Sequence, residues 1–367
     1  MTKGKIVENL SDFAHESVRA GAHVKDNSRN IDTLMSSFPD DQKVDTISVP
    51  QDESRTLSAT RTRADRIYRG ISTGAGLLTL VLLVFIGSFL LIRSHDALSY
   101  SGLKFFTNTQ WQPQGTPAVF GILAVMYWTV IIAVISLIIA IPLAIAIAIF
   151  LTDFAPRNLR KALTAMVDLL AAIPSLIYGL WGLFVLQPLL VPFAGAVSRA
   201  FPGVPFLKVD SPAYTSSAFI AGVVVSLMVL PIIASIVREV FSQAPMGERE
   251  AALALGSTRW DMIRAVVLPF GRGGIIGGSM LGLGRALGET IAVALIISPT
   301  FVISPQVLHT GSNSVAALIA LKFGEASGLA LSALMAAGLS LFVLTLIVNF
   351  LASMVVSRSR SGAGVDI

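Results

Sequence analysis

Hydrophobic residues are grouped in long stretches along the chain, separated by shorter polar segments. Six stretches are long enough to cross a bilayer, since a hydrocarbon core about 30 Å thick needs about 20 helical residues at about 1.5 Å each. They cover residues 71–92, 119–151, 162–191, 218–237, 271–298 and 327–356. The pattern predicts an all-α integral membrane protein with six transmembrane helices. Pro142 and Pro174 lie inside the second and third stretches and predict kinks there.

Composition agrees with a chain that faces lipid. Hydrophobic residues make up 54% of the sequence, charged residues only 13%, and the mean hydropathy is +0.75. A soluble domain carries about 25% charged residues. The net charge is +5, and the basic residues stand beside the apolar stretches, which favours a membrane surface over nucleic acid. The chain has no cysteine and only four scattered histidines, so no disulfide, thiol enzyme or metal site is expected.

The distribution of Lys and Arg predicts which side of the membrane each loop occupies, because cytosolic flanks are enriched in both. One set of segments carries Arg55, Arg61, Arg63, Arg66, Arg69, Arg157, Arg160, Lys161, Arg238, Arg249, Arg259, Arg264, Arg272, Arg358 and Arg360. The opposite segments carry only Arg93, Lys104, Arg199, Lys208 and Lys322. This bias predicts that both termini and the loop between the fourth and fifth spans are cytosolic.

The chain divides into three regions by composition. Residues 1–68 contain no long apolar stretch and hold 11 of the 22 acidic residues. They are predicted to form a polar, disordered cytosolic extension. Residues 69–358 form the predicted six-helix transmembrane domain, and residues 359–367 form a short cytosolic tail.

The loop between the fourth and fifth spans has the most specific pattern. It reads Glu250-Ala251-Ala252, three residues, Gly256, nine residues, then Val266-Val267-Leu268-Pro269. A helical run ends at Gly256, which can adopt a positive φ, and Ser257 or Thr258 can cap a second short helix. Apolar residues among the charged ones fit two interpretations: an interfacial helix resting on the membrane, or a helix that lies in a groove of a partner protein.

This loop resembles the EAA loop of ABC importer permeases, whose pattern is E-A-A, three residues, G, nine residues, I-x-L-P. Val266 stands where isoleucine is usual. The resemblance implies the type I permease fold. It also implies that the loop, residues 245–269, couples the membrane helices to a cytosolic ATPase through Glu250, Ala251, Ala252, Gly256, Leu268 and Pro269.

Two charged residues lie inside the fifth predicted span. A charge at the centre of a membrane helix costs about 2.5–3.5 kcal/mol, so Arg285 must face protein or water. Glu289 follows four residues later, within reach on a continuous helix. The residues alone leave two interpretations open. One is a buried ion pair that holds helices together. The other is an anion site, because a guanidinium matches two oxygens of a phosphate.

A closer resemblance covers roughly residues 65–358. Residues 285–293, R-A-L-G-E-T-I-A-V, and residues 172–179, A-I-P-S-L-I-Y-G, are similar to two motifs of the PstC family, permeases of phosphate-specific ABC importers. The long polar N-terminus departs from that family. The resemblance implies that Arg285 and Glu289 take part in phosphate passage, and we expect Thr290 and Ser175 to line the same pathway.

The resemblance also implies a function. The chain is expected to be a multi-pass permease subunit of an ATP-driven phosphate importer in the bacterial cell membrane, forming half of the pathway. Its implied partners are a PstA-type permease, two copies of a PstB-type ATPase and an extracytoplasmic PstS-type phosphate-binding protein. No P-loop of the form G-x-x-x-x-G-K-[ST] occurs in the chain. We therefore expect no enzyme activity and no cofactor on this chain, with ATP and Mg bound by the ATPase.

Other functional classes remain open at this level. One is a permease for another oxyanion. Another is an ion-coupled secondary transporter, in which Glu289 is a protonation site but the 245–269 loop has no role. A third is a membrane-anchored signalling scaffold, for which the long N-terminus is the sole hint.

Overall fold

The computed structural model describes residues 63–209 and 213–359. The chain divides into two units, residues 1–70 and 71–367, and the arrangement described here is that of the second. Most of the predicted N-terminal extension and residues 360–367 of the predicted tail lie outside the described residues. The first described helix begins at Arg63, earlier than the predicted transmembrane domain.

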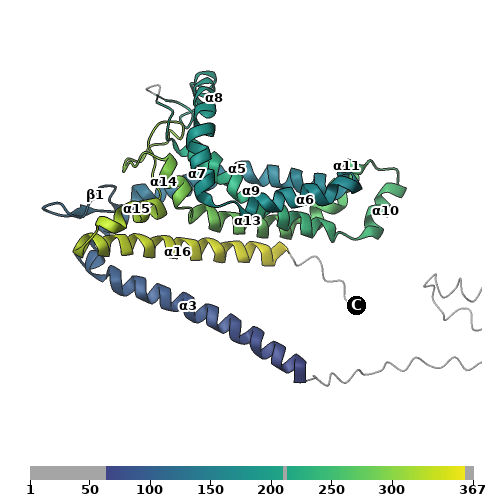
Figure 1. Cartoon of the computed structure of the whole chain (residues 1–367), viewed down its shortest axis with the longest axis horizontal. Coiled ribbons are helices and arrows are strands. Elements are labelled where there is room, and N and C mark those ends of the chain that lie inside the picture. Colours follow the sequence, from purple (N-terminus) through teal and green to yellow (C-terminus); the bar gives the residue numbers. More distant parts are fainter. Residues whose placement is uncertain (1–62, 210–212, 360–367) are drawn as a thin grey trace, which may run out of the picture. The chain divides into compact units, whose positions relative to one another are not determined.

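Helices make up most of the described structure (Figure 1). The first half contains α3 (Arg63–Ser101), α4 (Lys104–Thr107), α5 (Leu123–Ile149), the π-helix η2 (Phe150–Phe154), α6 (Arg157–Ala172), α7 (Ser175–Trp181), η3 (Gly182–Leu186) and α8 (Gln187–Ala200). The second contains α9 (Ala218–Ser242), α10 (Met246–Ala254), α11 (Arg259–Met262), η4 (Ile263–Val267), α12 (Leu268–Phe270), α13 (Arg272–Leu287), α14 (Ile291–Ile296), α15 (Val315–Lys322), η5 (Phe323–Glu325) and α16 (Gly328–Ser359). Two short strands, β1 (Trp111–Gln112) and β2 (Val119–Phe120), pair antiparallel.

The described part of the chain contains five candidate spans, or six if one bent pair of helices counts as a span. Among the described residues, five segments are long and apolar enough to cross a membrane: Asp65–Ser101, Leu123–Phe154, Ser175–Ala200, Ala218–Ser242 and Gly328–Met354. A sixth comes from Arg259–Phe270 and Arg272–Leu287, which meet at a 65° bend. The predicted cytosolic side of the termini stays a prediction.

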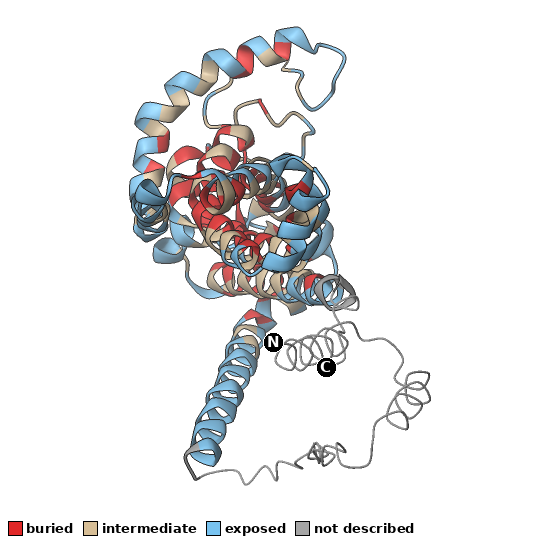
Figure 2. Ribbon diagram, turned by 90° about the vertical axis from the view of Figure 1, so that its right-hand side faces the viewer, coloured by how far each residue is buried: buried red, intermediate tan, exposed pale blue. Residues whose placement is uncertain are grey.

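Helices α5 and α9 pack along each other and contribute many residues of the main core. Figure 2 shows the buried residues gathered inside the helix bundle. The face of α5 toward α9 is built from small residues, with Ala140, Ala144 and Ala148 fully buried at every fourth position. On α9, a methyl group added to Gly222 would lie 2.5 Å from the Cγ2 atom of Ile135. Small residues allow helix backbones to approach closely, which is how membrane helices gain packing energy without a hydrophobic drive between them.

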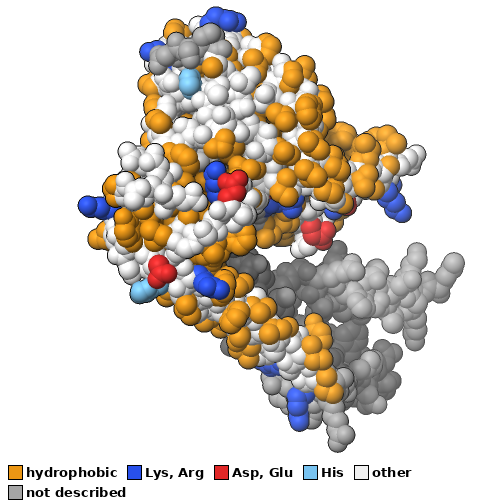
Figure 3. Space-filling view, turned by 60° about the vertical axis from the view of Figure 1, so that its left-hand side comes forward, with side chains coloured by type: hydrophobic (Ala, Val, Ile, Leu, Met, Phe, Trp, Pro, Cys, Tyr) orange, Lys and Arg blue, Asp and Glu red, His pale blue; other side chains and the backbone are white. Residues whose placement is uncertain are grey.

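Helix α3 presents its apolar side chains outward. Within the described chain, no residue in the most hydrophobic 18-residue segment of this helix is buried. Its later half meets α16, where Ala97 N–H donates to the Ser332 hydroxyl at 3.1 Å and that hydroxyl donates to the Arg93 carbonyl at 2.8 Å. Figure 3 shows hydrophobic side chains spread over the face in view among other side chains and backbone, with charged groups at scattered points. Such a surface is suited to lipid or to neighbouring membrane helices.

The third predicted span, residues 162–191, is wrong in its placement. Helix α6 ends at Ala172 and none of its residues is buried, whereas the membrane-compatible segment runs from Ser175 to Ala200. The interruption lies at Ile173 and Pro174, both with extended ψ angles. Proline lacks the N–H that would continue the helix and pushes the preceding residue out of the helical region. By contrast, α5 continues through Pro142.

Candidate functional site

The fifth predicted span is interrupted beside its charged residues. Helix α13 ends at Leu287, and α14 starts at Ile291. Glu289 is buried, and its Oε1 atom accepts from the Ala292 N–H at 3.3 Å, while the Thr290 hydroxyl donates to the Gly288 carbonyl at 3.1 Å. The predicted continuous helix over 271–298 is therefore wrong. Gly288 is a poor helix former. The side chains of Glu289 and Thr290 form hydrogen bonds with backbone groups that the interruption leaves without helical partners.

This interruption also changes the relationship between Arg285 and Glu289. On a continuous helix they would stack one turn apart, but within the described residues no ion pair joins them. Arg285 lies in the last turn of α13, half-buried, and its Nε atom is buried without a hydrogen-bond partner. A buried N–H without a partner carries a free-energy cost that a suitable acceptor removes. The ion-pair interpretation thus loses its geometric basis.

Helix α7 brings the second motif to the same place. It packs against α14, and a methyl group on Gly179 would lie 2.8 Å from the Cα atom of Ala292. The Tyr178 hydroxyl of α7 donates to the Leu170 carbonyl at 2.9 Å, across the break between α6 and α7. Ser175 is the first residue of α7 and is half-buried, but none of the contacts in the described chain joins it to Arg285.

The glycines of α13 serve close packing. A methyl group on Gly282 would lie 2.7 Å from the Cδ1 atom of Ile233, and one on Gly278 would touch Ile236 of the same helix, α9. This face of α13 is therefore filled by α9 rather than open as a cavity. In residues 63–209 and 213–359, no three His, Cys, Asp or Glu side chains gather closely enough to hold a metal ion.

The 245–269 loop folds as its residues predict. Helix α10 carries Glu250 and Ala251 exposed and Ala252 half-buried. Gly256 has φ +85°, and Thr258 caps α11 in a capping box with Asp261. Leu268 is half-buried against the main core, and Pro269 is exposed in α12. The inner side of the loop thus packs against the core. Its outer side carries large exposed apolar residues, among them Leu255, which is 89% exposed, and Trp260, which is 54% exposed.

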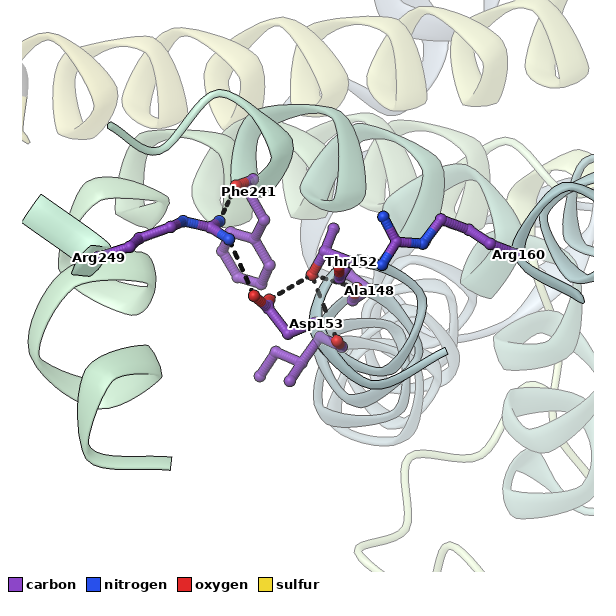
Figure 4. A network of polar contacts seen from close by, with 7 residues as sticks. Ala148, Thr152, Asp153, Arg160, Phe241 and Arg249 are labelled. Carbon is purple, nitrogen blue, oxygen red and sulfur yellow. Dashed lines mark hydrogen bonds and ion pairs between the residues drawn. The ribbon is translucent and has the colours of Figure 1, made fainter. Parts of the chain in front are cut away.

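Sequence reasoning missed a polar network at the base of this loop (Figure 4). Arg249 of α10 donates from Nη1 to Asp153 Oδ1 at 2.9 Å and from Nη2 to the Phe241 carbonyl at 2.6 Å. The Thr152 hydroxyl donates to Asp153 Oδ2 at 2.6 Å, and Arg160 donates to the Thr152 carbonyl at 2.7 Å. The one hint in the sequence is an isolated acid at the end of a long apolar stretch.

Comparison with known proteins places these features in a family. Residues 140–361 match the model of the binding-protein-dependent transport system inner membrane component. A phosphate transport system permease protein PstC 2 of Mycobacterium tuberculosis is 41% identical over 82% of this chain and 94% of its own length. A phosphate transport system permease protein PstC of Mesorhizobium japonicum is 42% identical over 82% of this chain and 92% of its own.

Solved structures confirm the fold. A chain of a bacterial alginate ABC transporter, crystallised with an alginate-bound periplasmic protein, aligns with a TM-score of 0.54 at 17% identity. The alignment covers 81% of this chain and 98% of that one. The protein is a multi-pass membrane component of an ABC transport system and not its ATPase. By its sequence and its fold, the chain belongs to the binding-protein-dependent transport system inner membrane components and, among them, to the PstC permeases.

Proposed function

We propose that this chain imports inorganic phosphate and that the Arg285 guanidinium binds the anion on its way through the membrane. The observation that carries the proposal is the buried Nε atom of Arg285, which has no hydrogen-bond partner among the described residues, beside the interrupted helix at residues 288–290. Relatives named phosphate transport system permeases support the choice of substrate.

The chemistry of these residues suits phosphate. A guanidinium presents two parallel N–H donors, which match two oxygens of a tetrahedral anion. Glu289 uses Oε1 to cap α14, and in the proposal its other oxygen accepts a hydrogen bond from a protonated phosphate. Sulfate carries no proton near neutral pH and offers no such donor. The carboxylate therefore favours phosphate over sulfate and limits how tightly the site holds a fully charged anion.

We propose that the permease works in a complex. A PstA-type permease supplies the other half of the pathway, and an extracytoplasmic PstS-type protein delivers phosphate. Two PstB-type ATPases bind ATP and Mg, while this chain binds no cofactor itself. The exposed apolar residues of the 245–269 loop support an attached cytosolic subunit, because such side chains fit a groove on a partner protein.

Uptake in proteoliposomes tests the proposal. The purified complex is reconstituted with ATP inside or outside the vesicles, together with a PstS-type protein, and radiolabelled phosphate is counted. We expect ATP-dependent uptake that excess sulfate does not compete for and that an uncoupler leaves intact. Uptake that survives without ATP and stops with the uncoupler would instead identify an ion-coupled transporter.

A further inference from the structure

The first helix of the 245–269 loop meets the helix bundle through Arg249 and Ala252. No residue of α10 is fully buried. Its half-buried residues are Arg249 and Ala252, and the others are exposed. They are three apart and so lie on the same side of the helix, whereas Glu250 and Leu253 are exposed on other sides. The inner side of α10 packs against the helix bundle, and its outer side is accessible to another protein.

Arg249 connects α10 to two membrane helices at once. Its Nη1 atom binds Asp153 in η2, the continuation of α5, and its Nη2 atom binds the Phe241 carbonyl in the last turn of α9. That carbonyl also accepts from the Ala244 N–H at 3.3 Å just beyond the helix, and the end of a helix attracts a cation. Because α5 and α9 pack along each other, the guanidinium joins α10 to the most extensively packed pair in the bundle.

The contact is buried and geometrically specific. The side chain of Asp153 is 7% exposed and that of Arg249 is 13% exposed. Both carboxylate oxygens are used, one by Arg249 and the other by the Thr152 hydroxyl. Removing one member of a buried pair leaves the other charge without compensation, so the two residues act as a unit. This pairing, the Arg249–Asp153 bridge, is a rigid link between loop and bundle.

We propose that the Arg249–Asp153 bridge transmits displacement of α10 to the ends of α5 and α9 during transport. Arg249 and Asp153 are positioning residues in this role, since neither contacts the anion. The other half of the loop has a separate connection, because Ile263 and Val267 are buried in the core and α12 leads directly into α13 and Arg285. The inference rests on the proposed function, in which an ATPase moves the loop.

The test compares transport with ATP hydrolysis in the reconstituted complex. Arg249→Lys keeps the charge but cannot hold Asp153 and the Phe241 carbonyl together, and Asp153→Asn keeps the shape but loses the charge. We expect both complexes to retain the ATPase subunit and hydrolyse ATP, while phosphate imported per ATP falls about tenfold, as loss of a charge-assisted contact predicts. Arg157→Lys, an exposed arginine of α6 outside the network, is the matched control and keeps the wild-type ratio.

A double variant separates coupling from simple stability. Arg249→Met with Asp153→Leu removes both charges, and because the residues act as a unit we expect its transport ratio to be no lower than that of either single variant. Arg249→Lys is the mildest change, and a wild-type ratio of phosphate imported per ATP in this variant would overturn the inference. The inference would also be overturned if the two substitutions lowered this ratio independently, so that their effects multiplied in the double variant. A wild-type complex without ATP-dependent phosphate uptake would contradict the proposed function instead. Faster hydrogen exchange in α10 of Arg249→Lys would still support the bridge, and unchanged exchange would overturn it.

Discussion

Gly179 of α7 lies so close to Ala292 of α14 that a methyl group on it would stand 2.8 Å from the Ala292 Cα atom. Real carbon atoms without a bond between them do not approach this closely. The contact joins the two motifs of the candidate site, since α14 follows Glu289 and α7 begins at Ser175.

Gly179→Ala should therefore push α7 away from α14. We expect a cost of about 1–3 kcal/mol from overpacking, with a lower melting temperature and reduced phosphate uptake. Gly277→Ala is the matched control, because nothing lies within 4 Å of the added methyl group there. Thermal unfolding in detergent and uptake in vesicles measure the two effects. Equal values for both variants would show that this contact does not matter for transport.

Arg285→Lys keeps the positive charge and removes the paired donors of the guanidinium. Loss of one charge-assisted hydrogen bond, worth about 1.5–3 kcal/mol, should lower phosphate uptake about tenfold or more. Initial uptake rates over a range of phosphate concentrations measure the change. Arg285→Gln removes the charge as well and should be worse still. Wild-type uptake by Arg285→Gln would place this residue outside the pathway.

Glu289→Gln separates two roles of the carboxylate. The amide oxygen can still cap α14 at the Ala292 N–H, so we expect the protein to fold normally. The amide group would donate to an anion instead of accepting from it, which should weaken discrimination against sulfate. Competition of sulfate with radiolabelled phosphate measures this, with intact melting behaviour as the check on folding. Unchanged selectivity would argue against a carboxylate contact with phosphate.

Gly256→Ala tests the turn in the 245–269 loop. The position has φ +85°, and a residue with a Cβ atom in that region costs about 1–2 kcal/mol even where space is free. We expect the loop to shift, with less ATPase recovered on co-purification and lower uptake. Gly247→Ala, which has open space and no positive φ, should behave as wild type.

Glu250→Ala tests the exposed side of α10, where an ATPase would bind in the proposed complex. Loss of this exposed carboxylate should leave the permease folded and should lower uptake and ATPase recovery. The melting temperature in detergent provides the check on folding. Normal uptake in both Gly256→Ala and Glu250→Ala would remove the basis for a coupling role of this loop.

The structural features predicted correctly from the sequence are those that depend on residues close to one another in the chain. Gly256 and the cap at Thr258 follow from backbone preferences that act within a few positions, and both are confirmed. The number of spans follows from hydrophobicity alone, and six agrees with the structure when the bent pair Arg259–Phe270 and Arg272–Leu287 counts as one span. The roles of Ser175, Thr290, Arg285 and Glu289 in transport stay predictions.

The errors arose where the chain leaves a regular helix. Hydropathy does not register the break at Ile173 and Pro174, because both flanks are apolar enough to be read as one stretch. The ion pair between Arg285 and Glu289, one of the two interpretations left open, assumed a continuous helix, which is interrupted at Gly288. Arg249 and Asp153 are 96 residues apart, so no local pattern connects them.

Three interruptions in the chain separate the unbroken helices of this bundle from shorter helical segments. Helices α5, α9 and α16 run without a break, whereas the chain is interrupted before Ser175, bent by 65° at Gly271 and interrupted again after Leu287. A break in a membrane helix leaves backbone groups to be satisfied elsewhere, so it persists only where surrounding protein or water supports it. We therefore expect short segments such as α14 to turn about their ends while α5, α9 and α16 keep their shape, which opens and closes a passage without melting any helix.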